Sequence, residues 1–408
     1  MNALVLGFAL TTCTSADPEP PKPISPERIK ELVKKLEEPT REMGDQRDGP
    51  PDGPWPTFNY QWHYREFSEL RLAGDAAVPA LLALLEDKTK PGQARAQAVA
   101  MLVERLVGTK VKPDTKIIAT INAALKENDP ALRFGTLNSL AVMGLGNRRE
   151  TREQFKNDPG IAEYVKKWPP PEETSFSPEA MDAFLPQVVA TLTDEHPEVV
   201  IGATQAIAWF GRPKTGTPEL IAALKRKEPG VRAAAVSTLG RVGTDDPAAL
   251  KAVLGELDRP EPYREAWQYQ LVIEAVGRFG PKAKDAVGRL GEIVKDDRAG
   301  QSLSDRSSLH DAAVQALGKI GSDAKAAVPA LLGCLDKKLY EGDSKTEYYH
   351  GRREEVLRAL DKIDPTAAKK ARADEKRKRE EAAKWYEDRY RSSPPIPEPS
   401  IFPPPVQP

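Results

Sequence analysis

Several chemistries are excluded by residues that this 408-residue chain lacks or uses sparingly. It has two cysteines, Cys13 and Cys334, whose separation and surroundings suggest neither a disulfide framework nor a metal knuckle. Aromatic residues make up 6% of the chain, while 60 Lys and Arg balance 61 Asp and Glu to a formal charge of −1. No overall electric field therefore directs the protein toward nucleic acid or anionic lipid, and a nucleic-acid partner is not expected.

Long hydrophobic runs and catalytic motifs are also missing. No stretch approaches the ~20 apolar residues that a membrane-spanning helix needs. The sequence contains no Gly-x-Ser-x-Gly elbow, no His-Glu-x-x-His and no Cys-x-x-Cys. The four histidines are scattered, and we interpret His310 as a surface residue early in a helix and Cys334 as a small buried hydrophobe. The sequence thus predicts a protein without catalytic residues, metal or cofactor.

The N-terminus resembles an export signal. Ala3 to Leu10 is a short apolar run, and Thr14-Ser15-Ala16 supplies small residues suited to cleavage before Asp17. Only Met1 and Asn2 precede the run, so the usual basic segment is missing. Residues 1–16 are predicted to be a signal peptide, which places the protein in the periplasm or outside the cell. The alternatives are a lipid attached at Cys13, or a cytoplasmic protein if the run is not a signal.

What the chain has in abundance is an internal repeat. Val78-Pro79-Ala80-Leu81-Leu82 recurs as Val328-Pro329-Ala330-Leu331-Leu332. A five-residue coda also closes one apolar, helically spaced segment after another. Its copies end at Gly144, Gly211, Gly243, Gly280 and Gly321, with a degenerate copy ending at Asp364. From Gly211 onward the copies are 32, 37, 41 and 43 residues apart, which is the period of repeats made of two helices.

The coda has a physical reason. A terminal glycine suits the left-handed position that stops a helix, and the earlier glycine in Leu317-Gly318-Lys319-Ile320-Gly321 lets a neighbouring helix approach closely. A second helix precedes each coda segment and often begins with Pro. The pattern predicts an all-α solenoid of seven antiparallel helical hairpins, at 74–107, 113–144, 178–211, 215–243, 246–280, 281–321 and 323–364.

At this level of detail the repeat resembles a known family. The copy Pro229-Gly230-Val231-Arg232-Ala233-Ala234-Ala235-Val236-Ser237-Thr238-Leu239-Gly240-Arg241-Val242-Gly243 is similar to the second half of a HEAT repeat. Its Ala- and Gly-rich spacing is closest to the bacterial HEAT-like group named after phycobilin lyases. The family's Arg is present at Arg133 and Arg232 but replaced at Val200, which argues against a continuous arginine ladder.

The resemblance implies a non-catalytic scaffold that binds a protein along its row of second helices, and we expect a monomer. Two other functions stay open: a HEAT-like lyase or chaperone that handles a chromophore, and an envelope protein that binds carbohydrate.

The flanks of the repeat differ in composition. Residues 17–56 form a Pro-rich linker with one short amphipathic helix at 26–38, and residues 57–364 hold the solenoid. Residues 145–177 are an insertion between hairpins. Residues 365–391 form a charged helix, in which Lys376 to Arg379 could contact an anionic surface but whose interleaved glutamates favour a solvated helix. Residues 392–408 are a Pro-rich tail, expected to be extended or disordered.

Two regions carry candidate binding residues. The turns at 258–264, 297–307 and 337–352 are enlarged and should be neighbours on one edge of the solenoid, although tolerated loop growth explains them equally. Tyr, Trp and Arg dominate interface energetics. The candidates of these types in or beside the turns include Arg259, Tyr263, Trp267, Arg298, Tyr340, Tyr348 and Tyr349. The second region, 55–67, is rich in aromatics, including Trp55 and Trp62. It would either cover the open end of the first hairpin or stack against a sugar or peptide.

Overall fold

The computed structural model describes residues 24–37, 69–70, 73–106, 113–144, 177–210, 212–259, 266–295, 306–335 and 346–391. Throughout this part of the chain the regular structure is helical, as the sequence predicted. The chain divides into two compact units, residues 1–187 and 188–408. The division falls inside one helix, α9 (Pro178–Ala190).

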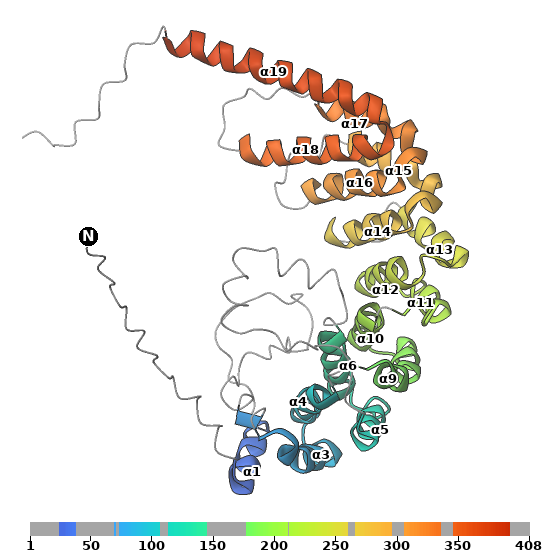
Figure 1. Cartoon of the computed structure of the whole chain (residues 1–408). Coiled ribbons are helices and arrows are strands. Elements are labelled where there is room, and N and C mark those ends of the chain that lie inside the picture. The colour runs from blue at the N-terminus through green and yellow to red at the C-terminus, as the bar shows by residue number, and fades with distance from the viewer. Residues whose placement is uncertain are drawn as a thin grey trace, which may run out of the picture. The chain divides into compact units, whose positions relative to one another are not determined.

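The first unit contains two complete hairpins (Figure 1). They are α3 (Val78–Glu86) with α4 (Gly92–Val103), and α5 (Thr115–Ala124) with α6 (Pro130–Gly144). The short helices η2 (Gly74–Ala77) and η3 (Glu104–Leu106) flank the first of them. α4 packs on α6, and α3 packs on α5, so each row of helices is continuous between the two hairpins.

An additional helix, α1 (Pro26–Lys35), packs against α3 and η2. Ser25 accepts a hydrogen bond from the backbone of Arg28 and so caps the start of this helix. Ile29, Leu32 and Val33 are buried, which is the apolar face that the sequence pattern indicated for this segment. Ion pairs from Arg28 to Glu69 (2.8 Å) and from Lys90 to Glu37 (2.6 Å) hold the polar side of the contact. α1 therefore covers apolar surface of the first hairpin.

The second unit also consists of stacked hairpins. After η5 (Thr191–Thr193), which packs on α10 (Pro197–Phe210), its hairpins are α11 (Thr217–Ala223) with α12 (Pro229–Val242), and α13 (Pro247–Leu257) with α14 (Ala266–Arg278). The last two are α15 (Val287–Lys295) with α16 (Arg306–Ile320), and α17 (Val328–Leu335) with α18 (Thr346–Ile363), preceded by η6 (Gly280–Ala286) and η8 (Gly321–Ala327) respectively. With α9 and α10, the described residues hold all seven predicted helix pairs.

Within this unit the helices form two rows. α10, α12, α14, α16 and α18 each pack on the next in chain order, and Figure 1 shows them stacked side by side. The first helices α11, α13, α15 and α17 lie in the other row. One hairpin cannot bury its own apolar stripe, and stacking supplies the core through side chains such as Val231, Ile273 and Leu317, which are all fully buried.

The glycines of the coda act mainly through close approach between second helices. A Cβ built on Gly240 would lie 2.7 Å from the Cα of Ala275, and one on Gly277 would lie 2.9 Å from the Cα of Ala316. Gly280 and Gly321 end their helices with positive φ values of 59° and 75°, as predicted. Gly243 differs, because its φ is −102°. Its Cβ would lie 2.6 Å from the Cβ of Ala249, so lack of space explains this glycine.

Buried or part-buried hydrogen-bond donors tie five of the described second helices to the ends of their first helices. In α4, Arg95 Nε donates to the carbonyl of Leu85 (2.8 Å), and in α12, Arg232 Nη1 donates to the carbonyls of Arg226 and Lys227 (both 2.8 Å). Such bonds satisfy carbonyls that the first helix leaves unpaired at its C-terminal end. The same role is taken by Arg133, Tyr269 and Arg353, which donate to the carbonyls of Glu127, Leu257 and Leu335. We call these residues the donor ladder.

The ladder also links neighbouring repeats through carboxylates. Arg95 makes a two-pronged ion pair with Glu127 of the next hairpin, at 2.9 and 2.7 Å. The Nε of Arg232 lies 4.0 Å from Glu256, again one hairpin further on. At Val200, where the sequence lacks the arginine, Arg226 of the next hairpin donates to the carbonyls of Asp194 (2.8 Å) and Glu195 (3.1 Å). The predicted break is thus filled by a side chain from another position.

Candidate binding surface

The exposed face of the second helices in unit 2 is built from two positions of the repeat. The first is the third coda residue, occupied by Trp209, Arg241, Arg278, Lys319 and Lys362. The second lies four residues earlier, one helical turn away, and is occupied by Gln205, Ser237, Glu274, Gln315 and Arg358. None of the ten side chains is fully buried, whereas most residues between them are. Each second helix therefore contributes two partly or fully exposed side chains to one continuous row.

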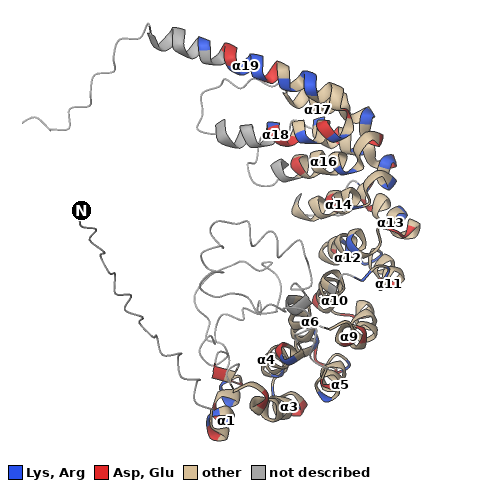
Figure 2. Ribbon diagram, in the orientation of Figure 1, with Lys and Arg blue, Asp and Glu red and all other residues tan. Residues whose placement is uncertain are grey.

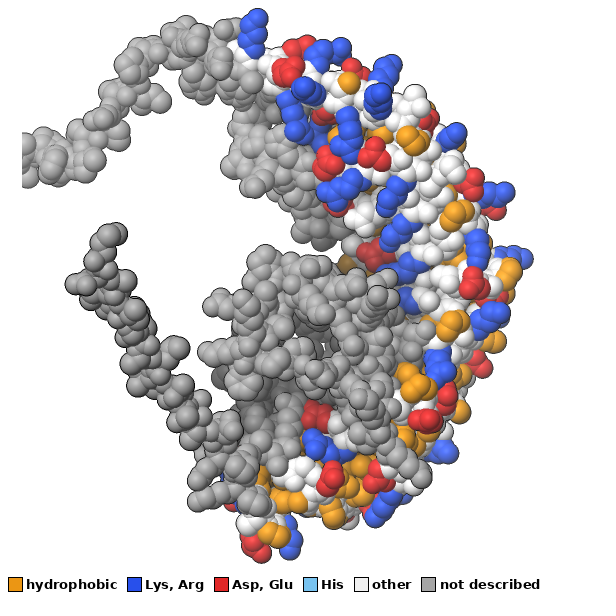
Figure 3. Space-filling model, in the orientation of Figure 1, with side chains coloured by type: hydrophobic (Ala, Val, Ile, Leu, Met, Phe, Trp, Pro, Cys, Tyr) orange, Lys and Arg blue, Asp and Glu red, His pale blue; other side chains and the backbone are white. Residues whose placement is uncertain are grey.

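Basic side chains predominate in this row. Figure 3 shows many Lys and Arg side chains on the visible face of the molecule, with Asp and Glu side chains among them. The guanidinium of Arg241 lies 5.1 Å from the ring centroid of Trp209, within the range of a cation–π contact. Arg278 is in part balanced by Glu274, whose Oε2 lies 3.5 Å from Nη2 of Arg278. From the sequence these coda residues were interpreted only as helix ends, although the repeated basic residue at the same place in each coda was visible there.

Of the candidate residues in the enlarged turns, the structure describes the side chains of Arg259 and Trp267, which flank the turn between α13 and α14. Arg259 follows α13, and its half-exposed side chain pairs with the buried carboxylate of Glu256 at 3.2 Å. Trp267 begins α14 and is 51% exposed. Tyr269 extends the same turn, where burial raises the pKa of its phenol above the ordinary value of 10.0.

The other predicted binding residues cannot be placed. Trp55, Trp62, Tyr263, Arg298 and Tyr340 lie outside the described residues. Tyr348 and Tyr349 lie in α18, where the structure does not describe side chains before Arg353. Their roles stay predictions, as does export, since residues 1–16 also lie outside the described part.

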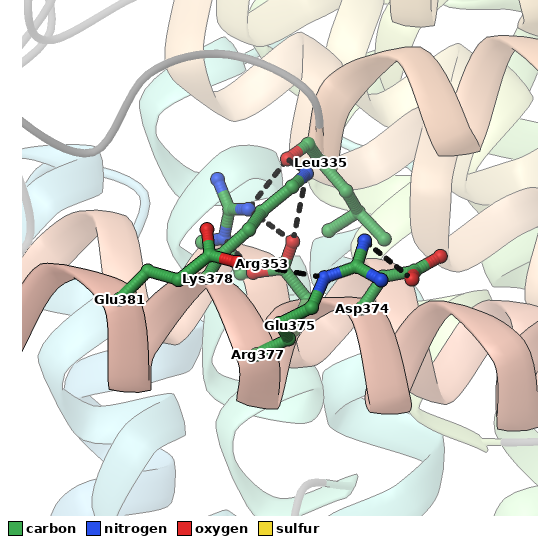
Figure 4. Close-up of polar contacts among 7 residues, drawn as sticks. All are labelled: Leu335, Arg353, Asp374, Glu375, Arg377, Lys378 and Glu381. Atoms are coloured by element: carbon green, nitrogen blue, oxygen red, sulfur yellow. Dashed lines mark hydrogen bonds and ion pairs between the residues drawn. The ribbon is translucent and has the colours of Figure 1, made fainter.

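The charged C-terminal helix, α19 (Pro365–Arg391), packs on α17 and α18 through its first half. Glu375 is buried there and pairs with Arg353, whose Nε donates to Oε2 at 2.6 Å, while Lys378 donates to the carbonyl of Leu335 at 3.1 Å (Figure 4). This repeats the geometry of Arg95 with Glu127. The start of α19 thus stands where the first helix of an eighth hairpin would stand.

Beyond this contact, α19 carries charges of both signs (Figure 2). Arg377 pairs with Asp374 (3.1 Å) and lies 3.8 Å from Glu381, and Lys376 lies 3.9 Å from Glu380. The basic residues at the centre of the helix are therefore accompanied by carboxylates one turn away, the arrangement of a solvated helix.

His310 and Cys334 lie closer together than the sequence suggested. The Nε2 of His310 is 3.4 Å from the sulfur of Cys334, and the Nδ1 is 3.3 Å from Asp311. His310 occupies the donor-ladder position of α16, and the thiol donates to the carbonyl of Ala330 (3.3 Å) and approaches that of Val294 (3.7 Å). The thiol and imidazole therefore take the place that an arginine takes in other hairpins, and Cys334 is more than a buried hydrophobe.

Metal and membrane sites were sought in the same residues. In the part of the chain that the structure describes, no group of three or more His, Cys, Asp or Glu could hold a metal ion. No described helix combines the length and apolar character needed to cross a membrane.

Comparison with known families decides the nature of the repeat. Residues 185–271 match the family described as HEAT repeats, and residues 310–337 match the PBS lyase HEAT-like repeat. The chain therefore contains HEAT repeats in these two segments. No curated protein sequence matches it.

Solved structures that align with the chain share little sequence with it. An engineered protein aligns over 86% of this chain and 88% of its own, with 18% identity and a TM-score of 0.40. The archaeal HEAT-like repeats protein from Thermococcus onnurineus NA1 aligns over 69% of this chain and 98% of its own, with 12% identity and a TM-score of 0.39. Kap121p aligns over 85% of this chain and 34% of its own, with 12% identity and a TM-score of 0.45. All three TM-scores are below 0.5, and nothing further about this chain is concluded from these structures.

Proposed function

We propose that this HEAT-repeat scaffold binds another protein along the exposed face of its second helices in residues 188–391. The observation that supports this proposal is the continuous row of α10, α12, α14, α16 and α18, each packed on the next. Stacking places equivalent exposed positions side by side, so a ligand lying across the helices meets every repeat in turn. Solenoids use such extended surfaces for binding because no single repeat offers a pocket.

The edge formed by the enlarged turns is the second surface on which a protein could dock. It is favoured by Trp267, a large aromatic that is 51% exposed at the start of α14. Exposed Trp residues are enriched at interfaces because a large apolar area is combined with a hydrogen-bond donor. This edge and the second-helix row make different predictions for where a partner would contact the protein.

Site-specific photo-crosslinking in the source organism would test the proposal. A photoreactive amino acid is placed in turn at Gln315, at Trp267 and at Lys251, which are exposed on the second-helix row, the turn edge and a first helix respectively. We expect a discrete adduct from Gln315 and none from Lys251. Adducts from Trp267 alone would mean that the partner binds at the turn edge and not along the second-helix row. Identical adducts from all three positions, or none from Gln315, would contradict binding along the second-helix row.

A further inference from the structure

The coda of the last hairpin differs from the others at its second residue. In the preceding codas this residue is small and buried: Ala141, Ala208, Gly240, Gly277 and Gly318. The glycines face the next second helix, and a Cβ built on Gly318 would lie 3.2 Å from the Cα of Ala359 in α18. In α18 the same position is occupied by Asp361, which is exposed. The position that receives a following helix on α12, α14 and α16 therefore carries a charge on α18.

An arginine of α19 binds both ends of the face of α18 on which Asp361 stands. Arg372 Nη2 donates to Oδ2 of Asp361 at 2.6 Å, and Nη1 lies 3.2 Å from each carboxylate oxygen of Glu354. Glu354 and Asp361 are seven residues apart, so they lie on one face of the helix, two turns from each other. We call Arg372, Glu354 and Asp361 the end clamp.

An apolar residue stands between the two carboxylates on the same face. Leu357 is four residues before Asp361, and the residues four before the coda glycines of α12, α14 and α16 are Val236, Ile273 and Val314. All four apolar side chains are buried, with 3% exposure or less. A further second helix packs on α12, α14 and α16, whereas among the described residues no further second helix follows α18. The end clamp thus takes the place of that helix at the end of the row.

We propose that the end clamp closes a latent self-association surface, on which the α18 of a second copy of the chain would otherwise pack. The occupant follows from the repeat, because the same face of α12, α14 and α16 receives another second helix of this chain. At the end of the row the equivalent helix is α18 of another copy, in a twofold contact between identical faces. Terminal repeats of a solenoid need a polar outer face to stay soluble. Binding of a partner along the second-helix row does not depend on this surface.

Charge makes the closed end unfavourable for helix packing. A helix laid on this face of α18 would bury Asp361 and Glu354 and displace Arg372 from them. Burying a charged group without its partner is costly, because the lost hydration is not replaced. Arg358, whose side chain is 65% exposed and lies 3.9 Å from Glu354, would lose water as well. The clamp therefore opposes stacking on α18.

Analytical ultracentrifugation of the full chain tests this proposal. Asp361→Ala with Arg372→Ala opens the clamp: it removes one carboxylate and one guanidinium, and it gives the last coda the alanine found at Ala141 and Ala208. We expect the wild-type chain to sediment as a monomer and the opened variant to form a dimer that dissociates on dilution. The dissociation constant of the dimer should fall by about tenfold or more relative to wild type, since the face no longer has to lose a charged pair.

An exposed ion pair of α19 supplies the matched control. Lys376→Ala with Glu380→Ala also removes one cation and one carboxylate, from a pair 3.9 Å apart on the exposed side of the helix, and should leave the chain as monomeric as wild type. A thiol then locates the contact. Added to the opened variant, Arg358→Cys should give a disulfide between two copies under mild oxidation, whereas Lys251→Cys, on the first helix α13, should not.

Circular dichroism checks that each variant keeps its helices. If Asp361→Ala with Arg372→Ala loses them, Asp361→Asn with Arg372→Gln removes the same two charges with less change of shape and should dimerise in its place. Three results would overturn the proposal: an opened, folded variant that stays monomeric, equal dimerisation of the Lys376→Ala with Glu380→Ala control, or a disulfide that forms equally well from Lys251→Cys.

Discussion

A few polar side chains donate hydrogen bonds to the carbonyls that the first helices leave unpaired at their C-terminal ends. Not all of these side chains come from the arginine position of the repeat. Arg95, Arg133, Arg232 and Arg353 donate to helix-terminal carbonyls from equivalent places in their hairpins. In the hairpin that has Val200 in place of the arginine, the carbonyls still need donors, and Arg226 of the following hairpin supplies two of them. Buried carbonyls need a partner, whichever residue provides it.

The carboxylate that pairs with Arg95 should make stability depend on pH in a defined direction. Hydrogen bonding to Arg95 lowers the pKa of Glu127 below its usual 4.5. A lowered folded-state pKa means that the stabilisation is complete above pH 4.5 and is lost as the pH falls through the folded value. Glu127→Gln should therefore lower the free energy of local opening of α4 and α5 at pH 7 by about 1–3 kcal/mol. The reason is that Arg95 stays buried but loses its charged partner. The difference from wild type should shrink below about pH 4.5.

Hydrogen exchange of the α4 and α5 amides measures this effect. Glu292→Gln serves as the control, since Glu292 pairs with Lys295 at 3.0 Å but both side chains are more than half exposed. That pair should contribute less than about 1 kcal/mol. A difference between Glu127→Gln and wild type that grows on acidification would mean that Glu127 is not held as a carboxylate by Arg95.

At the scale of elements, helix pairing is governed by small residues where second helices cross. Gly240 faces Ala275, and Gly318 faces Ala359, with Cβ-to-Cα distances of 2.7 and 3.2 Å for a Cβ built on each glycine. The same codas provide members of the exposed row, because Arg241 directly follows Gly240 and Lys319 directly follows Gly318. Close packing and the binding surface are thus specified by adjacent residues of one short motif.

Gly240→Ala should destabilise the second unit by about 1–3 kcal/mol, because the added methyl meets the backbone of Ala275 and α14 must move. Gly255→Ala provides a matched change in α13, where a Cβ at Gly255 has nothing within 4 Å. Alanine is the better helix former, so this second variant should be more stable by up to about 1 kcal/mol. Thermal unfolding followed by circular dichroism gives both values. A stabilising effect of Gly240→Ala would show that α12 and α14 have room between them.

Features that are set within one helix could be predicted from the sequence, whereas contacts between distant segments could not. The hairpins were predictable because helical periodicity, first-turn prolines and terminal glycines all act within one helix. Three other features depend on which segments meet in space. They are the donors that Arg226 supplies where Val200 has none, the contact of His310 with Cys334, and the docking of α19. Gly243 shows the limit within a motif, because it was expected to need a positive φ and is instead confined by Ala249. The basic residues at the third coda position are visible in the sequence, but the helices that carry them are placed side by side only by the stacking of α12 to α18.

At the scale of the whole molecule, stability should be distributed repeat by repeat instead of being shared by one core. In such arrays each repeat contacts its neighbours, and the terminal ones need a covering element. α19 covers α17 and α18 through the buried pair of Glu375 and Arg353.

Glu375→Ala leaves the guanidinium of Arg353 buried without this carboxylate, a change that costs about 3–5 kcal/mol when a buried pair is broken. Hydrogen exchange followed by mass spectrometry should then show faster exchange in α17, α18 and α19 and unchanged exchange in residues 73–144. Glu380→Ala, on the exposed side of α19, should change neither region. A uniform rise in exchange across both units after Glu375→Ala would mean that the chain unfolds as one cooperative body, which is incompatible with a repeat array stabilised by nearest neighbours.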